Sequence, residues 1–490
     1  MSGLSETARR LPRTELHIGG RWRAAADGAV HPIINPGNGQ PLGALSMATS
    51  VDVSAAVVAA RTQFETGAWS RLSGADRGRL LWRLADLVEA NRENLAYLEA
   101  IDIGRPYFEP FMFEIPLAAD TFRHFAGWAD KIGGSTFDLP DFDGRQRHSY
   151  TLRQPIGVVG AITPWNAPTM IASWKLGPAL AAGNTVVIKP AEDASLSTIR
   201  LVELIEEAGF PAGVVNLVTG SGAVAGDALV RHPGIDKISF TGSPGVGRRI
   251  AAIASEALKK VTLELGGKSP QIVCRDADLD RVIPGASISM FANQGQTCAS
   301  GSRVLVHEAI ADEVTERLVA AAQSVVVGDP FAPDTQMGSL VSERQLERVD
   351  GYVRKGKAEG ARLLTGGSRI DRPGSFYAPT LFAGDNDLTI AREEIFGPVG
   401  TIIRFRDNEE ALQLANQTDY GLTSVVWTRD LATANRFARQ LKTGSVWVNA
   451  WGPPHPALPW LGVKTSGLGS ELGWSGVLAN TVEKTVSVIS

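Results

Sequence analysis

The chain has 490 residues and a formal net charge of −4, from 48 basic and 52 acidic side chains. Hydrophobic residues make up 44% and charged residues 20%, which is typical of globular proteins and excludes a disordered or fibrous chain. At about 150 residues per domain, this length predicts about three folding units. The balanced charge offers nucleic acid no basic surface, and no window is apolar over the ~18 residues that spanning a membrane requires.

The two cysteines, Cys274 and Cys298, differ in their surroundings. The N-terminal residues lack the apolar core of a secretory signal, so we expect a cytoplasmic protein whose cysteines remain thiols. Cys274 ends an apolar run and fits a small core residue. Cys298 lies in the polar, glycine-rich stretch 293–303, where a ligand can approach and a backbone N–H can point at a reacting atom. Cys298 is therefore a candidate nucleophile.

The first half of the chain predicts helices followed by a parallel sheet. Residues 52–101 are predicted as two amphipathic helices, the second with Asp76 in its first turn and Leu80, Leu81, Leu84, Leu87 and Val88 at helical spacing. β-branched runs then alternate with helical stretches such as 196–208, which indicates right-handed crossovers and a sheet covered on both faces. The predicted strands are 156–162, 185–188, 214–218 and 237–240.

A second α/β stretch is predicted over about 265–451, with strands near 302–306, 399–405, 424–427 and 445–448. Two further segments, 138–153 and 482–488, alternate like strands but flank both sheets. We expect these two strands to pair with each other or with a partner chain. Because the chain has no low-complexity linker, the domains are expected to be interleaved.

Three motifs follow predicted strands and carry side chains that suit catalysis. Glu264 ends an alternating strand before a Gly-Gly turn, where a carboxylate can reach a cleft; the alternative is a solvated strand-end glutamate. Asn166, in Thr-Pro-Trp-Asn at 163–166, can donate to a developing oxyanion, although these residues alone also suit a turn. Ser243, within 240–247, can offer a helix N-terminus to a pyrophosphate, but the glycine pattern is not G-x-G-x-x-G. No metal motif is complete, so no metal site is expected.

Together these motifs, in order over nearly the whole chain, resemble the aldehyde dehydrogenase superfamily. The matching segments are 163–166, 189–192, 240–247, 264–270, 295–303, 393–398 and 464–469. The resemblance implies an oxidoreductase that converts an aldehyde to a carboxylic acid with NAD. It further implies that Cys298 is the nucleophile, that Glu264 is the general base, and that the Asn166 side chain and the Cys298 N–H form the oxyanion hole. Lys175 matches a lysine near the active site of the family.

The resemblance also assigns cofactor positions. Lys189 and Glu192 match residues that bind the adenosine ribose, Ser243 the pyrophosphate contact, and Glu394 and Phe396 the nicotinamide-ribose contacts. The remaining cofactor positions are Ile162, Thr163, Pro164, Trp165, Gly222, Phe240, Gly242, Leu265 and Gln345. A carboxylate at Glu192 would repel a 2′-phosphate, so NAD is predicted in preference to NADP.

Two departures from the family pattern affect the substrate pocket. Ala167 stands where many relatives have a bulky aromatic residue, and Trp460 replaces a usual Phe. We therefore expect a pocket reshaped for a wide or branched aldehyde. The further wall candidates are Met170, Trp174, Thr297 and Trp451. Ser470 also replaces an arginine that is common after the glycine-rich motif.

Several alternatives stay open at this point. They are a CoA-acylating relative, which Glu264 opposes, a phosphorylated or semialdehyde substrate, a catalytically silent structural or binding member, and a Cys-dependent hydrolase. The resemblance implies an α/β architecture with a Rossmann-like cofactor domain at 1–135 and 156–265 and a catalytic domain at 266–474. The segments 136–155 and 475–490 would form an oligomerisation ribbon, giving a homodimer or homotetramer.

Overall fold

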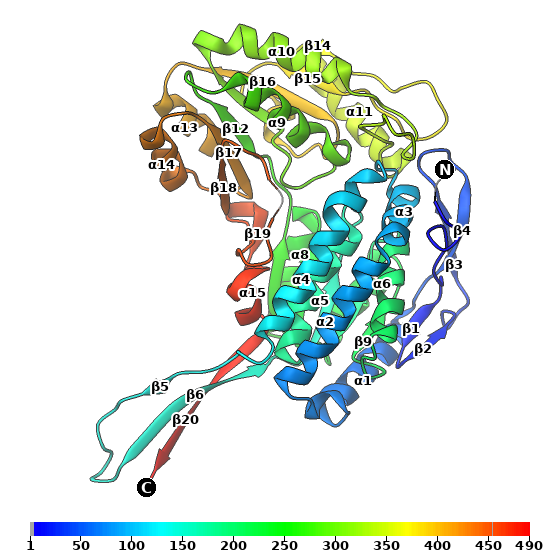
Figure 1. The fold of residues 1–490 in the computed structure, drawn as a ribbon, viewed down its shortest axis with the longest axis vertical. Helices are drawn as coiled ribbons and strands as arrows, with labels where there is room; N and C mark the ends of the chain where they lie inside the picture. The colour runs from blue at the N-terminus through cyan, green and yellow to red at the C-terminus, as the bar shows by residue number, and fades with distance from the viewer. Residues whose placement is uncertain (1–3, 453) are drawn as a thin grey trace.

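The computed structural model describes residues 4–452 and 454–490 (Figure 1). Within these residues, an eight-stranded sheet has the order β19-β11-β10-β7-β8-β9-β1-β2. Its parallel strands are β7 (Val158–Ile162), β8 (Thr185–Lys189), β9 (Val215–Leu217), β10 (Lys237–Thr241) and β11 (Lys260–Glu264). The antiparallel edge strands are β1 (Leu16–Ile18), β2 (Arg21–Arg23) and β19 (Gly467–Leu468). The four strands predicted here are confirmed, with ends that differ by one or two residues.

Helices cover both faces of this sheet (Figure 1). They are α1 (Ser50–Glu65), α2 (Gly74–Ala90), α3 (Arg92–Ile103), α4 (Ile115–Trp128), α5 (Pro168–Ala182), α6 (Leu196–Glu207), α7 (Asp227–Arg231) and α8 (Pro244–Glu256). The prediction of two helices over 52–101 is wrong, because three form there. Asn91 is both the C-cap of α2 and the N-cap of α3, and this break interrupts an otherwise helical pattern. The predicted start of α2 is confirmed by a capping box between Ser73 and Asp76.

A seven-stranded sheet has the order β14-β15-β16-β13-β12-β17-β18. Its strands are β12 (Pro270–Val273), β13 (Arg303–His307), β14 (Arg362–Thr365), β15 (Thr380–Ala383), β16 (Val399–Phe405), β17 (Thr423–Trp427) and β18 (Ser445–Val448). Only β14 is antiparallel to its neighbour. The longer accompanying helices are α9 (Leu279–Phe291), α10 (Ala311–Ser324), α11 (Glu343–Ala358), α13 (Asn408–Asn416) and α14 (Leu431–Gln440). The four strands predicted in this half are confirmed.

A narrow three-stranded sheet projects from the body of the molecule (Figure 1). It consists of β5 (Thr136–Phe137), β6 (Arg147–Pro155) and β20 (Thr481–Ile489). The last two pair antiparallel along their whole length, so the two flanking segments do find each other. A separate hairpin is formed by β3 (Val30–Ile34) and β4 (Pro41–Ser46).

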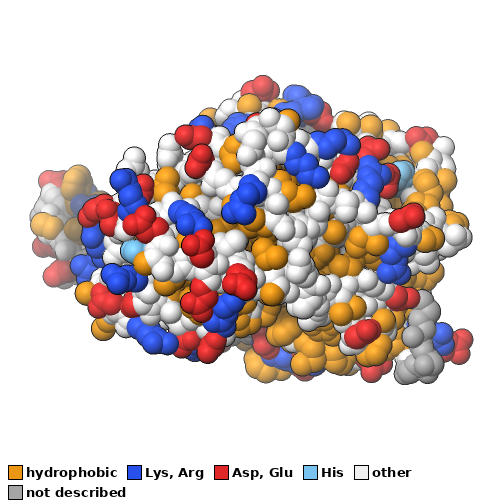
Figure 2. Space-filling model, turned by 90° about the horizontal axis from the view of Figure 1, so that it is seen from above, with side chains coloured by type: hydrophobic (Ala, Val, Ile, Leu, Met, Phe, Trp, Pro, Cys, Tyr) orange, Lys and Arg blue, Asp and Glu red, His pale blue; other side chains and the backbone are white. Residues whose placement is uncertain are grey.

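On the face seen in Figure 2, basic and acidic side chains are interspersed. Among residues 4–452 and 454–490, no helix is long and apolar enough to cross a bilayer.

Candidate active site

The segments that carry Asn166, Glu264 and Cys298 meet between the two large sheets. Asn166 follows β7, and Glu264 is the last residue of β11, at the same edge of the eight-stranded sheet. The Gly-Gly turn after Glu264 packs directly against the Cys298 loop, because a side chain at Gly267 would overlap the Cys298 carbonyl oxygen. The prediction that these motifs lie at carboxyl ends of strands is therefore confirmed for β7 and β11.

The loop before Cys298 has a strained backbone. Asn293, Gln294 and Gly295 have φ values of 49°, 56° and 69°, so three consecutive residues are left-handed. Non-glycine residues in this region cost on the order of 1–3 kcal/mol each and persist where surrounding contacts fix them. The Asn293 Nδ2 donates to the Asn166 carbonyl at 2.7 Å, and the Asn166 Nδ2 donates to the Gln296 carbonyl at 2.9 Å. The Asn166 amide is thus tied to the loop that presents Cys298.

Burial disfavours the ionised forms of both Cys298 and Glu264. The pKa of the Cys298 thiol is raised, first by burial and then by the negative charges of Glu264 and Glu394. The pKa of Glu264 is raised well above its usual value by burial and next by the charge of Glu471, while Lys175 and the Trp460 indole act in the opposite direction. The Glu264 Oε1 has no hydrogen-bond partner among the described residues. A carboxylate of raised pKa that keeps a vacant acceptor is suited to take a proton from water.

Lys175 forms a buried ion pair that the sequence did not reveal. Its Nζ lies 2.5 Å from the Glu471 Oε1, and both side chains are less than 5% exposed. The Ser239 hydroxyl donates to the same carboxylate oxygen at 2.9 Å and accepts from Lys175 at 3.2 Å. Glu471 comes from the turn before α15 (Gly473–Leu478) and stands 296 positions along the chain from Lys175. No local pattern marks it, so only the fold brings it to the site.

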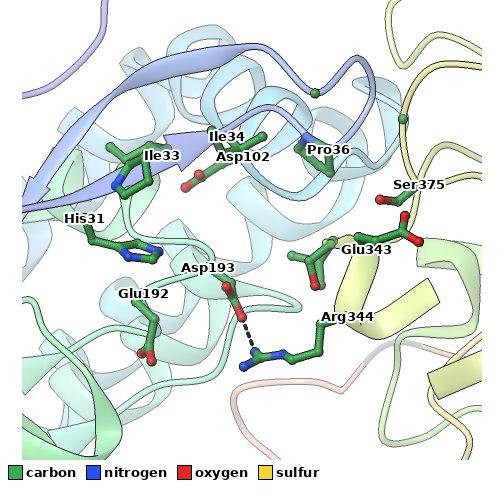
Figure 3. A pocket seen from close by; sticks show the side chains of 15 residues that line it. His31, Ile33, Ile34, Pro36, Asp102, Glu192, Asp193, Glu343, Arg344 and Ser375 are labelled. Carbon is green, nitrogen blue, oxygen red and sulfur yellow. Dashed lines mark hydrogen bonds and ion pairs between the residues drawn. The ribbon is translucent and has the colours of Figure 1, made fainter. Parts of the chain in front are cut away.

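One end of the predicted cofactor crevice lies beside a cavity of about 460 Å³. The Lys189 Nζ donates to the carbonyls of Pro190 and Gly220, both at 2.7 Å, and lies 3.6 Å from a Glu192 carboxylate oxygen. Glu192 lines the cavity, which extends between the β3–β4 hairpin and the N-terminus of α11 (Figure 3). Across it, Asp193 accepts from Arg344 at 2.6 Å.

The other end brings together four predicted cofactor residues from distant segments. The Glu394 carboxylate accepts from the Gly267 N–H at 3.0 Å, and burial raises its pKa to about 7. Phe396, at a φ of 62°, lies edge-on to Trp165 with ring centroids 5.2 Å apart. The Gln345 side chain donates to the Phe396 carbonyl at 2.7 Å, so it acts on the Phe396 backbone.

The predicted cofactor positions between these two ends offer groups that suit a dinucleotide. Ser243 is the N-cap residue of α8, and a Cβ at Gly245 in the first turn would meet no described atom within 4 Å, so the backbone is open to a pyrophosphate. The Thr163 and Thr241 hydroxyls, at the ends of β7 and β10, are buried and have no partner in residues 4–452 and 454–490. The remaining predicted positions are Ile162, Pro164, Phe240, Gly242 and Leu265, at or just after the ends of β7, β10 and β11, and Gly222, which begins a short helical turn at 222–226 after β9.

Four tryptophans cluster beside the first turns of α5. Trp174 and Trp460 have ring centroids 5.6 Å apart, and Trp447 lies 6.3 Å from Trp460 and 6.4 Å from Trp451. The Trp451 indole donates to the Ala299 carbonyl at 3.1 Å, which connects this cluster to the Cys298 loop. Trp447, on β18, was not among the predicted pocket residues.

The other predicted pocket residues lie at the start of α5 and in the loop beside Cys298. Ala167 is buried at the N-cap of α5, and Met170 lies partly buried in its first turn. Thr297 is partly exposed beside Cys298. Within the described residues, the Trp174 and Trp460 indole nitrogens are buried without a partner, so both can donate to a bound molecule.

Comparison with known proteins identifies the family. The pattern described as "Aldehyde dehydrogenase family" matches residues 22–486. Human mitochondrial aldehyde dehydrogenase is 46% identical over 478 residues, covering 97% of this chain and 92% of the relative. Mouse retinal dehydrogenase 2 is 44% identical with the same coverage. The NAD⁺ complex of an aldehyde dehydrogenase from Bacillus cereus has a TM-score of 0.95 at 43% identity, covering 97% of this chain and 96% of that one.

The chain belongs to the aldehyde dehydrogenase family. It is an oxidoreductase that acts on aldehydes with a nicotinamide dinucleotide, as the resemblance implied.

Proposed function

We propose that the chain oxidises an aldehyde to a carboxylic acid through a thioester on Cys298, which Glu264 hydrolyses as general base. The observation that carries this proposal is the direct packing of the turn after Glu264 against the Cys298 loop, to which the Asn166 amide is also tied. A nucleophile, a base and an oxyanion donor therefore share one buried site.

In the first half-reaction, the Cys298 thiolate adds to the aldehyde carbon. The bond from Asn166 to Gln296 uses one of the two Nδ2 hydrogens, and the second donates to the new oxyanion together with the Cys298 N–H. In comparable sites, one such donor contributes about 3–4 kcal/mol to transition-state stabilisation. NAD, when bound, supplies the acceptor for the hydride that leaves the carbon. A thioester remains on the Cys298 sulfur.

In the second half-reaction, Glu264 removes a proton from a water molecule. The resulting hydroxide adds to the thioester carbon, the C–S bond of the adduct breaks to release the Cys298 thiolate, and the carboxylic acid remains as the product. Because burial and Glu471 raise the pKa of Glu264, this half-reaction requires a pH high enough to ionise it. A CoA-acylating enzyme has no need of this base, so the buried Glu264 favours hydrolysis.

We further propose a preference for NAD over NADP. Glu192 and Asp193 place two carboxylates at one end of the crevice, and a 2′-phosphate bound beside Glu192 would be repelled. Lys189 cannot offset this repulsion fully, because its ammonium already donates to two carbonyls. The ratio of kcat/KM for NAD to that for NADP tests the preference, and a ratio below one would contradict it.

We propose that the substrate is a wide or branched aldehyde. Ala167 leaves room at the start of α5, while Trp174, Trp447, Trp451 and Trp460 supply a broad aromatic wall. The name of the related mouse retinal dehydrogenase 2 is in keeping with a large apolar aldehyde. A panel of linear, branched and aromatic aldehydes, followed as NADH at 340 nm, tests this proposal, and equal efficiencies across the panel would contradict it.

The division of the chain into domains is also a proposal. We infer a cofactor domain at 1–135 and 156–265, a catalytic domain at 266–474, and an oligomerisation ribbon at 136–155 and 475–490. Phe137, Leu152 and Val488 are more than 40% exposed on that ribbon, which supports contact with a second copy of the chain. Sedimentation equilibrium tests this, and a monomer at micromolar concentration would contradict it. Two free thiols support a cytoplasmic location.

A further inference from the structure

A cluster of four buried charged side chains lies beneath the Cys298 loop, outside the motifs considered so far. Arg105 follows the C-cap of α3, and its guanidinium lies 3.6 Å from Glu99, 3.0 Å from Glu109 and 2.5 Å from Glu114. None of the four side chains is more than 15% exposed. Burying three carboxylates around one cation costs several kcal/mol unless each makes further contacts, so the cluster is not explained by packing alone.

An unusual turn brings two of these carboxylates to the same arginine. The segment η2 (Pro110–Glu114) is a single π-helical turn at the start of α4, and the Ile115 N–H donates to the Pro110 carbonyl five residues before it. Glu109 and Glu114 stand five positions apart, a spacing that regular α-helical geometry places on different faces. The wider turn allows both to reach Arg105. Single π-turns of this kind are frequent at functional sites.

Glu109 is in direct contact with the strained loop. Both of its carboxylate oxygens accept from the Asn293 N–H, at 3.2 and 3.3 Å. The Asn293 side chain in turn donates to the carbonyls of Asn166 and Gln296, and the latter also accepts from the Asn166 amide. A continuous path of hydrogen bonds therefore runs from Arg105 through Glu109 and Asn293 to the side chain proposed as the oxyanion donor.

Glu99, another member of the cluster, contacts the chain segment that follows Asn166. The Glu99 Oε1 accepts from the Thr169 N–H at 3.2 Å, in the first turn of α5 and three residues after Asn166. The cluster therefore contacts both the loop at Asn293 and the first turn of α5 at Thr169. The relative position of these two segments determines where the Asn166 amide points.

We propose that Arg105 and Glu109 are positioning residues of the oxyanion hole: they hold Asn293 in its left-handed conformation and so aim the Asn166 amide at the reacting carbonyl. The inference rests on the proposed role of Asn166. A charge-assisted hydrogen bond is about twice as strong as a neutral one, which suits a carboxylate that must stabilise a strained backbone N–H. Arg105 keeps that carboxylate paired and oriented.

The test compares single-turnover rates of NADH formation in the full-length enzyme. Glu109→Ala is expected to slow this step by about 10- to 100-fold, because a misplacement on the order of 1 Å has effects of that size. Glu109→Gln is expected to stay within about threefold of the wild type, since an amide oxygen still accepts from the Asn293 N–H. The rate of Cys298 alkylation by iodoacetamide, which requires no oxyanion, is expected to change less than about twofold in both variants.

A matched control separates positioning from stability. Glu203 is a similarly buried carboxylate, 2.6 Å from Arg200 on α6 and outside the site, and Glu203→Ala should leave NADH formation unchanged. Equal slowing by Glu109→Ala and Glu203→Ala would overturn the inference. If Glu109→Ala does not fold, Glu109→Asp replaces it in the test. Aspartate keeps the negative charge, but its shorter side chain moves the carboxylate oxygens away from the Asn293 N–H. A wild-type rate of NADH formation in Glu109→Asp would also overturn the inference.

Asn166→Ala distinguishes failure of the inference from failure of the proposed function. We expect Asn166→Ala to slow NADH formation, and Glu109→Ala to add less than about a further twofold in the double variant, because coupled residues are not additive. A full rate in Asn166→Ala would overturn the oxyanion role itself. A slow Asn166→Ala beside a normal Glu109→Ala would overturn only the positioning role.

Discussion

The ammonium of Lys175 and the carboxylate of Glu471 lie 2.5 Å apart in a fully buried pair that adjoins Glu264. The two charges act on Glu264 in opposite directions, since Glu471 raises its pKa and Lys175 lowers it. Both charges therefore change the pKa of the buried Glu264 carboxyl group. If Glu264 is the general base, as proposed, the pair influences the pH at which the thioester is hydrolysed.

Removing either charge should move the pH dependence of thioester hydrolysis in a defined direction. Catalysis needs ionised Glu264, so the rate rises with pH through the Glu264 pKa. Glu471→Gln removes the negative charge, lowers that pKa and moves the rising limb to lower pH. Lys175→Met removes the positive charge and moves the limb to higher pH. Single-turnover hydrolysis measured from pH 5 to 10 checks both shifts.

Glu483→Gln is the control. Glu483 lies on the three-stranded sheet, and its replacement changes the net charge as much as Glu471→Gln does, but it should not shift the rising limb of the pH profile. Shifts of the same sign in Glu471→Gln and Lys175→Met would contradict the account.

Filling the space at Ala167 should narrow the substrate range. Ala167 is buried at the start of α5, so Ala167→Phe introduces a ring next to Asn166, whose side chain is hydrogen-bonded to the loop that carries Cys298. We expect kcat/KM for branched or aromatic aldehydes to fall by about tenfold or more, and that for short linear aldehydes to stay within about threefold. Met170→Leu conserves volume and serves as the control. Equal changes for wide and linear aldehydes would count against the proposed pocket.

Cofactor preference should depend on Glu192. Glu192→Gln removes a carboxylate from the end of the crevice, so kcat/KM for NADP should rise and that for NAD should fall. Glu343→Gln is a matched control, because Glu343 is an exposed carboxylate that lines the same cavity (Figure 3). If Glu192→Gln leaves the ratio of the two efficiencies unchanged, Glu192 does not discriminate between the cofactors.

The cap of α2 should contribute measurably to stability. The Ser73 hydroxyl accepts from the Asp76 N–H, and the Asp76 carboxylate accepts from the Ser73 N–H. Ser73→Ala should lower the free energy of unfolding by about 1 kcal/mol, measured by urea denaturation, with kcat unchanged. Ser70→Ala, an exposed serine in the preceding turn, should have a smaller effect.

The parts of the fold that follow from local sequence were predicted well. Val399–Phe405 is a strand whose bounds match the prediction, because a buried parallel strand is a largely β-branched and apolar run; Ser445–Val448, a partly exposed edge strand, also matches. The break at Asn91 was missed, since the apolar spacing continues across it and only the cap geometry interrupts the helix.

In the candidate site, motif residues could be named in advance, whereas their supporting residues could not. Asn166, Glu264 and Cys298 each stand in a recognisable segment near the end or the start of a strand. Glu471 and Glu109 reach the site from segments with no motif, through contacts that span 296 and 184 positions. Such contacts depend on tertiary packing, which a single sequence does not encode locally.

The central claim is that Cys298 carries a thioester that Glu264 hydrolyses, and Glu264→Gln tests it most directly. This variant keeps the side-chain shape but loses the base. Mixed with an aldehyde and NAD, it should release one equivalent of NADH per site in a burst and then stall, with an acyl adduct on the Cys298 peptide detected by mass spectrometry; Cys298→Ala should give neither. Steady turnover of Glu264→Gln at the wild-type rate, or NADH formation by Cys298→Ala, would contradict the account.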